Sequence, residues 1–226
     1  MRKTIFENTI IMSGYLELII GPMFSGKTSK LLEIYKQCEF CGIRVVIVNH
    51  AIDTRYDSLF ENQPLEKVEP NQETIPLPNF DSTFPKSGFL KVDTMLSSHD
   101  KVTAPCIRAA TLDEARKTNI FQDAEVILIN EGQFFDDLYE FVVDMLKEKK
   151  KIYICGLDGD FERKPIGTIL SLIPLCDNVT KLTSLCSICR NGTLGIFSMR
   201  LTEEKSQILV GVDNYVPVCR MCYERK

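Results

Sequence analysis

The chain has 226 residues, of which 44% are hydrophobic and 26% charged, and its formal net charge is −4. This length and composition are sufficient for one main domain and a smaller second one. The acidic balance disfavours a dedicated nucleic-acid-binding protein, which usually carries a basic excess. No apolar run reaches the roughly 20 residues of a membrane span. We therefore expect neither nucleic acid nor membrane as a partner.

Residues 1–14 begin with basic residues, but Glu7 and Asn8 interrupt the apolar run that a secretory signal requires. We interpret this segment as a short leader before the first strand. The chain has nine cysteines, an odd number. Without a secretion signal they indicate reduced thiols and a cytoplasmic location.

The first elements form a strand–turn–helix–strand unit. The apolar runs at 15–20 and 43–48 are typical of strands buried on both faces, and residues 28–40 between them have helical spacing. Further elements follow: a helix at 111–118, a strand at 125–129, a helix at 138–146, and strands at 151–155 and 179–182. The alternation predicts an α/β fold with a parallel sheet and a ligand at the carboxyl ends of its strands.

Residues 58–105 interrupt this pattern, because six of the ten prolines fall there, five of them between positions 64 and 85. Proline removes a backbone donor and disfavours both helices and central strands. We therefore expect a long surface insertion at about 58–98 within the main domain. The sequence leaves three roles open for this insertion: covering the site, contacting a neighbouring subunit, or no functional role.

Residues 21–28 (GPMFSGKT) match the phosphate-loop pattern G-x-x-x-x-G-K-[ST]. The glycines allow backbone N–H groups to surround phosphates, Lys27 neutralises the β and γ phosphates, and the Thr28 hydroxyl binds Mg²⁺. The pattern lies between a predicted strand and a predicted helix, the context in which it binds nucleotide. The predicted ATP-binding residues here are Gly21, Pro22, Met23, Phe24, Ser25, Gly26, Lys27 and Thr28.

Two cysteine pairs, Cys186-x-x-Cys189 and Cys219-x-x-Cys222, lie in a C-terminal segment with little helical periodicity. Two such pairs complete the closed tetrahedron of a structural zinc site. We therefore predict a small zinc-binding domain at 184–226.

The remaining cysteines and the histidines are interpreted as structural. Cys38-x-x-Cys41 has the zinc spacing but no partner pair, which favours plain packing. The other three thiols read as small apolar residues; they are Cys106, Cys155 and Cys176. His50 and His99 have no ligand at convincing spacing.

Five stretches in order carry a family resemblance: GPMFSGKT, DTRY at 53–56, EGQFFDDL at 131–138, LDGDFERKPIG at 157–167, and paired cysteines with Asp213-Asn214-Tyr215 before the second pair. They resemble the type II thymidine kinases, the cytosolic and viral enzymes. The resemblance implies a RecA-like P-loop domain at 15–183 and a zinc-held "lasso" between the cysteine pairs (190–218). It also implies ATP-dependent phosphorylation of the thymidine 5′-hydroxyl, and homotetramers.

The resemblance also implies roles for individual residues. Glu131 resembles the general base that accepts the proton of the 5′-hydroxyl. The implied ATP site further includes Asp53, Thr54, Arg55, Asn130, Glu131, Gly132 and Gln133. The implied nucleoside site includes Met23, Gln133, Phe134, Leu157, Phe161, lasso main chain at Ile208, Leu209, Val210 and Gly211, and Tyr215 at the sugar. From residue type alone, Phe134, Leu157 and Phe161 fit core packing better, and only the motif match favours the pocket.

Asn130 departs from the family pattern, which has Asp-Glu where this chain has Asn130-Glu131. An amide keeps an acceptor oxygen but loses the charge that attracts Mg²⁺. The expectation is weakened metal affinity with the reaction retained. Two alternatives stay open: a non-catalytic nucleotide- or nucleoside-binding homologue, and a nucleic-acid-dependent ATPase.

Overall fold

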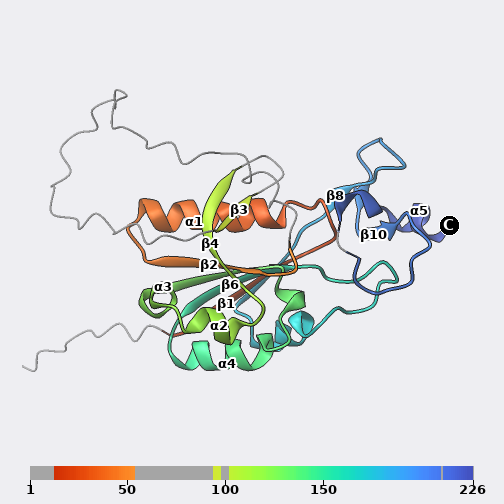
Figure 1. Cartoon of the computed structure of the whole chain (residues 1–226). Helices are drawn as coiled ribbons and strands as arrows, with labels where there is room; N and C mark the ends of the chain where they lie inside the picture. Colours follow the sequence, from red (N-terminus) through yellow and green to blue (C-terminus); the bar gives the residue numbers. More distant parts are fainter. Residues whose placement is uncertain (1–12, 54–93, 98–101, 210, 226) are drawn as a thin grey trace, which may run out of the picture.

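The computed structural model describes residues 13–53, 94–97, 102–209 and 211–225 (Figure 1). Its centre is a seven-stranded sheet in the order β3-β4-β2-β5-β6-β1-β7. Neighbouring strands are parallel, except that β3 and β4 are antiparallel. The strands are β1 (Tyr15–Ile20), β2 (Val45–His50), β3 (Thr94–Ser97), β4 (Thr103–Ala109), β5 (Val126–Asn130), β6 (Lys151–Gly156) and β7 (Asn178–Lys181).

Helices cover both faces of the sheet (Figure 1). On one face lies α1 (Lys27–Phe40), whose Leu31, Leu32 and Cys38 pack in one apolar cluster. On the other face lie α2 (Leu112–Arg116), α3 (Asn119–Asp123) and α4 (Leu138–Lys147), packed in a second cluster. Both clusters draw residues from the central strands, which explains why these strands read as continuous apolar runs.

The two short 3-10 helices flank the functional edge of the sheet. They are η2 (Gly132–Phe134), directly after β5, and η3 (Ile169–Leu175), after the loop that follows β6. Because β1, β2, β5 and β6 are mutually parallel, the segments that follow them all leave from one edge of the sheet. This edge receives the phosphate loop and the polar residues discussed below.

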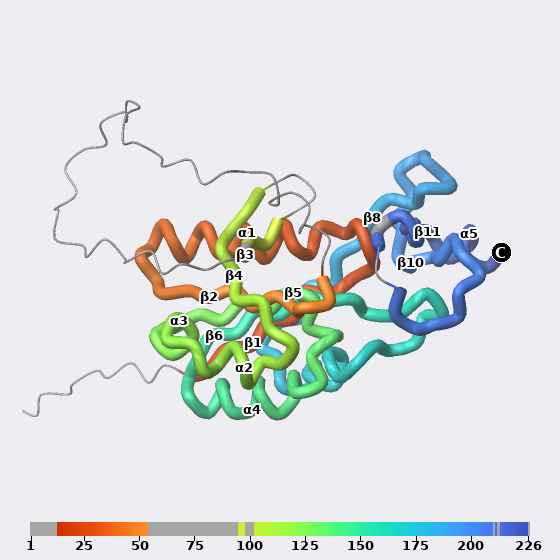
Figure 2. Tube along the Cα trace, viewed as in Figure 1, coloured from red at the N-terminus to blue at the C-terminus, as the bar shows by residue number. Residues whose placement is uncertain are grey.

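Residues from Ser184 onward form a small module at one end of the molecule (Figure 2). Its apolar core has only five buried residues: Cys186, Met199, Val218, Cys219 and Cys222. Its elements are β8 (Ser184–Leu185), β9 (Leu194–Gly195), β10 (Phe197–Arg200), η4 (Val212–Asn214), β11 (Tyr215–Val218) and α5 (Arg220–Glu224).

Most predicted elements are confirmed. β1 has the predicted bounds, and α1, β5, α4, β6 and β7 agree within one residue at each end, while β2 starts and ends two residues later than expected. The α/β class with a mostly parallel sheet is likewise confirmed. The predicted leader (apart from Ser13 and Gly14) and most of the predicted insertion at 58–98 lie outside the described residues.

Three expectations were wrong. β3 and β4 lie within 94–109, which proline content had assigned largely to an irregular segment. Pro105 is tolerated because it lies opposite Met95 of β3, before the part of β4 that also pairs with β2 from Ile107 onward. The helix expected at 111–118 ends at Arg116, because Thr118 caps a second helix, α3, by accepting the Phe121 N–H. The prediction also missed η3.

Candidate functional site

The phosphate loop joins β1 to α1 at the functional edge. Gly26 caps α1 with φ +82°, and α1 has no acidic residue in its first turn, so its positive end faces the loop uncompensated. Gly21 has φ +155°, and a Cβ there would lie 2.4 Å from the Leu182 carbonyl oxygen. Lys27 is buried and its Nζ donates to the Pro22 carbonyl at 2.7 Å, inside the loop. The loop therefore presents N–H groups and an ammonium group to an anion.

A chain of buried polar side chains runs beneath this loop. The Thr28 hydroxyl donates to Asn130 Oδ1 at 3.3 Å, and the Cys155 thiol donates to the same oxygen at 3.0 Å. Asn130 Nδ2 donates to Asn49 Oδ1 at 2.8 Å, and Asn49 Nδ2 donates to Asp53 Oδ2 at 3.4 Å. Asn130 is fully buried. The amide is thus paired on both sides, as a buried polar group must be.

Cys155 packs in the apolar core as expected, and its thiol also donates a hydrogen bond to Asn130. Cys38 and Cys106 also pack in the apolar core as expected, while Cys41 is exposed. All nine cysteines are free of disulfides.

Glu131 follows β5 and has a left-handed backbone, φ 53° and ψ 44°. Such a conformation is uncommon for a residue with a side chain and is often found at functional sites. The carboxylate lines the cavity and accepts a hydrogen bond of 2.7 Å from Gln133 Nε2. Gln133 Oε1 in turn accepts the Leu157 N–H at 3.1 Å, so the Gln133 amide fixes the orientation of Glu131.

The cavity is open to solvent. Its lining joins the phosphate loop to the ends of β2, β5 and β6 and to the C-terminal module. Among the predicted residues it brings together Met23, Phe24, Ser25, Gly26, Lys27, Thr28, Asp53, Glu131, Phe134, Leu157, Phe161, Ile208, Leu209, Gly211 and Tyr215. Phe134, Leu157 and Phe161 thus line a cavity rather than fill a core.

Other predicted residues lie behind this lining or outside the described part. Gly21, Pro22, Asn130, Gly132 and Gln133 are not among the lining residues, and they support the loop and Glu131 from beneath. For Gln133, the direct nucleoside contact stays a prediction. Thr54, Arg55, Val210 and His99 fall outside the described residues.

Described residues of the loop between β10 and η4 (201–209 and 211, hereafter the 201–211 loop) line one wall of the cavity. Arg200, 1% exposed, donates to the carbonyls of Glu204 at 2.8 Å and Gln207 at 3.1 Å, and also to that of Ser206. Its guanidinium lies 3.7 Å from the centre of the Phe161 ring. Arg200 also donates to the Tyr215 hydroxyl. One buried cation therefore holds the loop and two cavity-lining rings.

The module also contacts the phosphate loop directly. The Met23 N–H donates to the Ser198 hydroxyl at 2.9 Å, and Ser198 lines the cavity. Sequence reasoning missed Ser198, Arg200, Asp160 and Gln207. An arginine in a strand three residues after Phe197 gives no sign that it is buried, so composition and spacing offered no way to find it.

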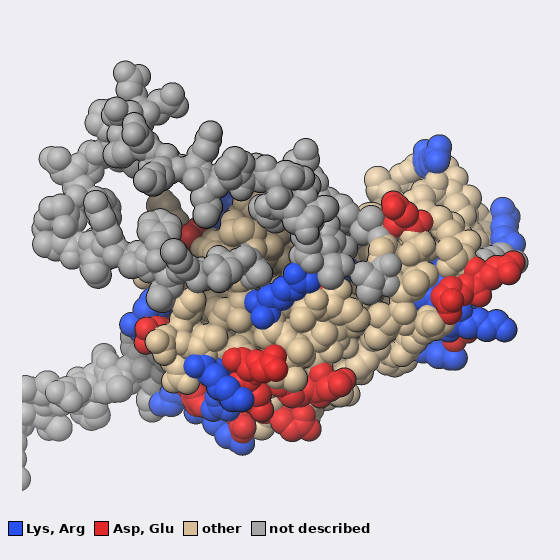
Figure 3. Space-filling model, in the orientation of Figure 1, with Lys and Arg blue, Asp and Glu red and all other residues tan. Residues whose placement is uncertain are grey.

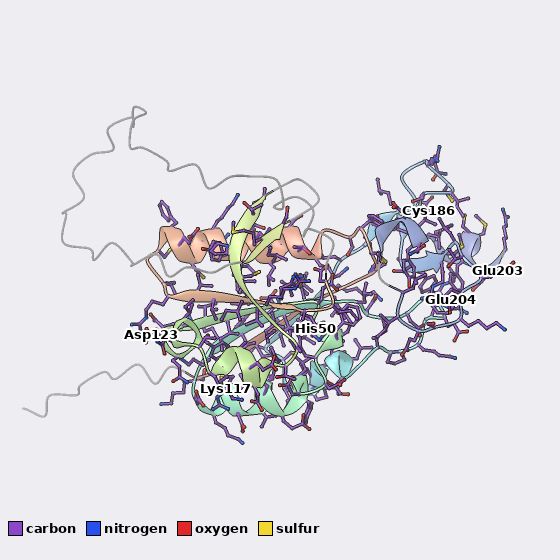
Figure 4. The ribbon with its side chains drawn as sticks, in the orientation of Figure 1. His50, Lys117, Asp123, Cys186, Glu203 and Glu204 are labelled. Atoms are coloured by element: carbon purple, nitrogen blue, oxygen red, sulfur yellow. The ribbon has the colours of Figure 1, made fainter. Side chains whose placement is uncertain are left out.

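The four predicted zinc ligands lie together, with their sulfur atoms all within 4.8 Å of one another. Cys189 Sγ lies 3.7 Å from Cys219 Sγ and 3.4 Å from Cys222 Sγ, close to the roughly 3.8 Å edge of a tetrahedron with Zn–S bonds of about 2.3 Å. Figure 4 shows Cys186 in the module, well away from His50 at the end of β2. The arrangement fits a structural zinc ion.

Backbone N–H groups surround the zinc-ligand sulfurs. The Cys189 N–H lies 3.5 Å from Cys186 Sγ, and the Cys222 N–H lies 3.4 Å from Cys219 Sγ. Burial alone would raise the pKa of Cys186, but backbone N–H groups of Cys189, Cys219 and Ile188 lower it to about 6. Hydrogen bonds with the Cys189 and Cys219 sulfurs raise the pKa of Cys222 to about 12. Because a thiolate is the form that binds metal, binding of a cation at these four cysteines would release protons.

His50 lies beside the cavity rather than in it. Its Nδ1 accepts the Ile52 N–H at 3.1 Å. The centre of its ring lies 4.7 Å from that of Phe135, in an edge-on arrangement, and 5.8 Å from that of Phe134. Burial lowers the pKa of His50. These contacts agree with the structural role expected for it.

Comparisons with known proteins agree with this arrangement. The family model "Thymidine kinase" matches residues 14–84 and 89–223. Bovine cytosolic thymidine kinase is 33% identical over 217 residues, which cover 94% of this chain and 73% of that protein. Thymidine kinase 1 of Dictyostelium discoideum is 31% identical over 94% of this chain and 78% of that protein. Variola virus thymidine kinase is 35% identical over 93% of this chain and 97% of that protein. The chain belongs to the thymidine kinase family.

Proposed function

We propose that this protein transfers the γ-phosphoryl group of ATP to the 5′-hydroxyl of thymidine. The observation that carries the proposal is that Glu131 and the phosphate-loop residues Lys27 and Thr28 line the same cavity. Phosphoryl transfer needs a base near the attacking hydroxyl and positive charge at the transferring group, and this cavity supplies both.

On the phosphate side, the loop N–H groups and the start of α1 hold the β and γ phosphates. Lys27 currently donates to the Pro22 carbonyl and turns to the phosphates when nucleotide binds. Thr28, with Asp53 nearby, fits a magnesium site, since hydroxyl and carboxylate oxygens suit that ion. A magnesium ion held there would neutralise part of the phosphate charge.

On the nucleoside side, Glu131 accepts the proton of the 5′-hydroxyl while Gln133 keeps its carboxylate in place. Met23, Phe134, Leu157 and Phe161 surround the thymine ring, and main-chain groups at 208–211 contact its polar edge. The Tyr215 hydroxyl oxygen accepts a hydrogen bond from Arg200. The hydroxyl proton of Tyr215 therefore points away from the guanidinium and toward the sugar.

The zinc ion has a structural role in this proposal. The closed set Cys186, Cys189, Cys219 and Cys222 leaves no open coordination position for substrate. The metal fixes both ends of the lasso, and we assign residues 184–226 to a separate zinc-binding domain after the kinase domain at 15–183. Homo-oligomers and a cytoplasmic location belong to the same proposal.

The two rival functions have weaker support. On the face in Figure 3, the Lys and Arg side chains of the C-terminal module are interspersed with acidic ones, which disfavours a nucleic-acid surface on the described part of that face. As a separate finding, no helix in the described ranges is long and apolar enough to cross a bilayer.

The second rival, a non-catalytic homologue, is motivated by Asn130. The hydrogen bond that Asn130 accepts from Thr28 retains the acceptor that the loop needs.

The test is formation of thymidine monophosphate from thymidine and ATP across a series of Mg²⁺ concentrations. Product that requires both substrates supports the proposal. Thymidine and ATP binding without product would identify a non-catalytic homologue. ATP hydrolysis that needs DNA but not thymidine would instead support the nucleic-acid-dependent ATPase.

A further inference from the structure

Gln207 lies in the 201–211 loop, which lines one wall of the cavity, and its side chain contacts the segment after β6. Gln207 Nε2 donates to Asp160 Oδ2 at 2.9 Å and to the Pro165 carbonyl at 3.2 Å. Both Gln207 and Asp160 line the cavity. Figure 2 shows these two segments approaching one another beside the module. The contact therefore connects the module with the loop that follows β6.

Asp160 is a fixed acceptor for this contact. It is buried, and its other oxygen, Oδ1, accepts the N–H groups of Glu162 and Lys164, each at 2.8 Å. The Asp160 N–H donates to the Lys164 carbonyl at 2.8 Å. A carboxylate held on one side by two N–H groups presents its second oxygen in a defined place.

Arg200 fixes the same loop from the opposite side. It gathers the carbonyls of Glu204, Ser206 and Gln207, so Gln207 is held by its main chain as well as by its side chain. Ile208, which follows directly, lines the cavity together with Leu209 and Gly211. The contacts of Gln207 thus hold the residue that directly precedes the cavity-lining main chain.

We propose that Gln207 is a positioning residue for nucleoside binding, acting through its bridge to Asp160. The bridge sets how far the main chain at Ile208 and Leu209 lies from the base, and a displacement of about 1 Å in such a contact lowers productive binding strongly. This inference rests on the proposed function. It adds a specific side-chain pair, Gln207 and Asp160, that holds the lasso over the substrate.

The first variant is Gln207→Glu, which places a carboxylate opposite Asp160 and the Pro165 carbonyl. Arg200, whose guanidinium donates to the Gln207 carbonyl, is the nearby cation and offsets part of this repulsion. We expect the KM for thymidine to rise about tenfold, because one charge-assisted hydrogen bond is lost. The KM for ATP should change by less than about twofold. Gln207→Ala, which removes the donor without adding charge, shifts thymidine KM in the same direction by less.

The second variant reverses the polarity of the bridge. Asp160→Asn combined with Gln207→Glu gives an amide donor on the loop after β6 and a carboxylate acceptor on the 201–211 loop. The amide oxygen still accepts the N–H groups of Glu162 and Lys164. We expect the thymidine KM to return part of the way, since the Pro165 carbonyl lacks its donor. Gln122→Glu, an exposed change in α3, is the matched control.

The readouts separate this inference from the proposed function. Thymidine binding by calorimetry accompanies turnover for every variant, with zinc content and melting temperature as checks on folding. A wild-type protein that neither binds nor phosphorylates thymidine overturns both. An active wild type with unchanged thymidine KM in Gln207→Glu overturns the inference alone. Equal increases in the KM for thymidine and ATP, or no recovery in the double variant, also overturn it.

Discussion

The two sides of the cavity are stabilised in different ways. The phosphate side is built on strands β1, β2, β5 and β6, which are buried between two apolar clusters. The nucleoside side is built on a module whose apolar core has five residues, three of them cysteines. So small a core rarely stabilises a domain without a metal or disulfide. The contrast teaches that one wall of this site depends on the sheet and the other on the four-cysteine cluster and on the hydrogen bonds of Arg200 and Gln207.

The largest expected effect is on the phosphate side. Glu131→Gln removes the proposed base but keeps the size of the side chain, so kcat should fall by about 10²- to 10⁴-fold with both KM values little changed. Steady-state kinetics measures this, with the exposed Glu140→Gln as control. A kcat within about threefold of wild type would remove Glu131 from the role of base.

Zinc removal tests the nucleoside side. Cys219→Ser, or chelation, should leave the module without its cross-link, so the thymidine KM should rise about 100-fold or more. ATP binding, measured by nucleotide titration, should change far less because the sheet holds the phosphate loop. The exposed Cys41→Ser is the control for loss of a thiol. Equal loss of ATP binding would mean that the two walls are not independent, with the Met23–Ser198 contact as the connection.

Asn130→Asp tests the charge beneath the phosphate loop. A carboxylate beside Thr28 should attract magnesium and lower the Mg²⁺ concentration for half-maximal rate by about tenfold. The cost is a lower melting temperature without Mg²⁺, because the new charge is fully buried. Magnesium titration of the initial rate is the measurement, and the exposed Asn178→Asp is the control. An unchanged magnesium requirement would show that the amide does not limit metal binding.

The smallest expected effect concerns His50. Burial lowers its pKa below the usual 6.5, so the unfolded chain binds the proton more readily than the folded one. Its contribution to the free energy of unfolding is complete above pH 6.5 and is lost as the pH falls through the lowered folded pKa. His50→Gln should therefore lose less stability than the wild type on acidification. Melting curves at several pH values measure this, and an identical acid loss in both proteins would contradict it.

The main elements could be predicted because their signals are local. The run YLELII and the pattern GPMFSGKT specify a strand, a turn and a helix start without help from distant residues. β4 could not be predicted, since the place of Pro105 in a strand depends on which neighbours pair at that point. The sequence is compatible with Thr118 as a helix N-cap, but it is equally compatible with one continuous helix through that position.

By itself, the sequence determined the phosphate loop, the four cysteines that cluster, the position of Glu131 and the family, because each rests on fixed spacing along the chain. Only the tertiary structure decided what holds the site together. Asn130 with Asn49, and Gln207 with Asp160, are far apart in sequence and meet through hydrogen bonds. Such pairs depend on distance and donor geometry in the folded chain, and residue spacing carries no record of either.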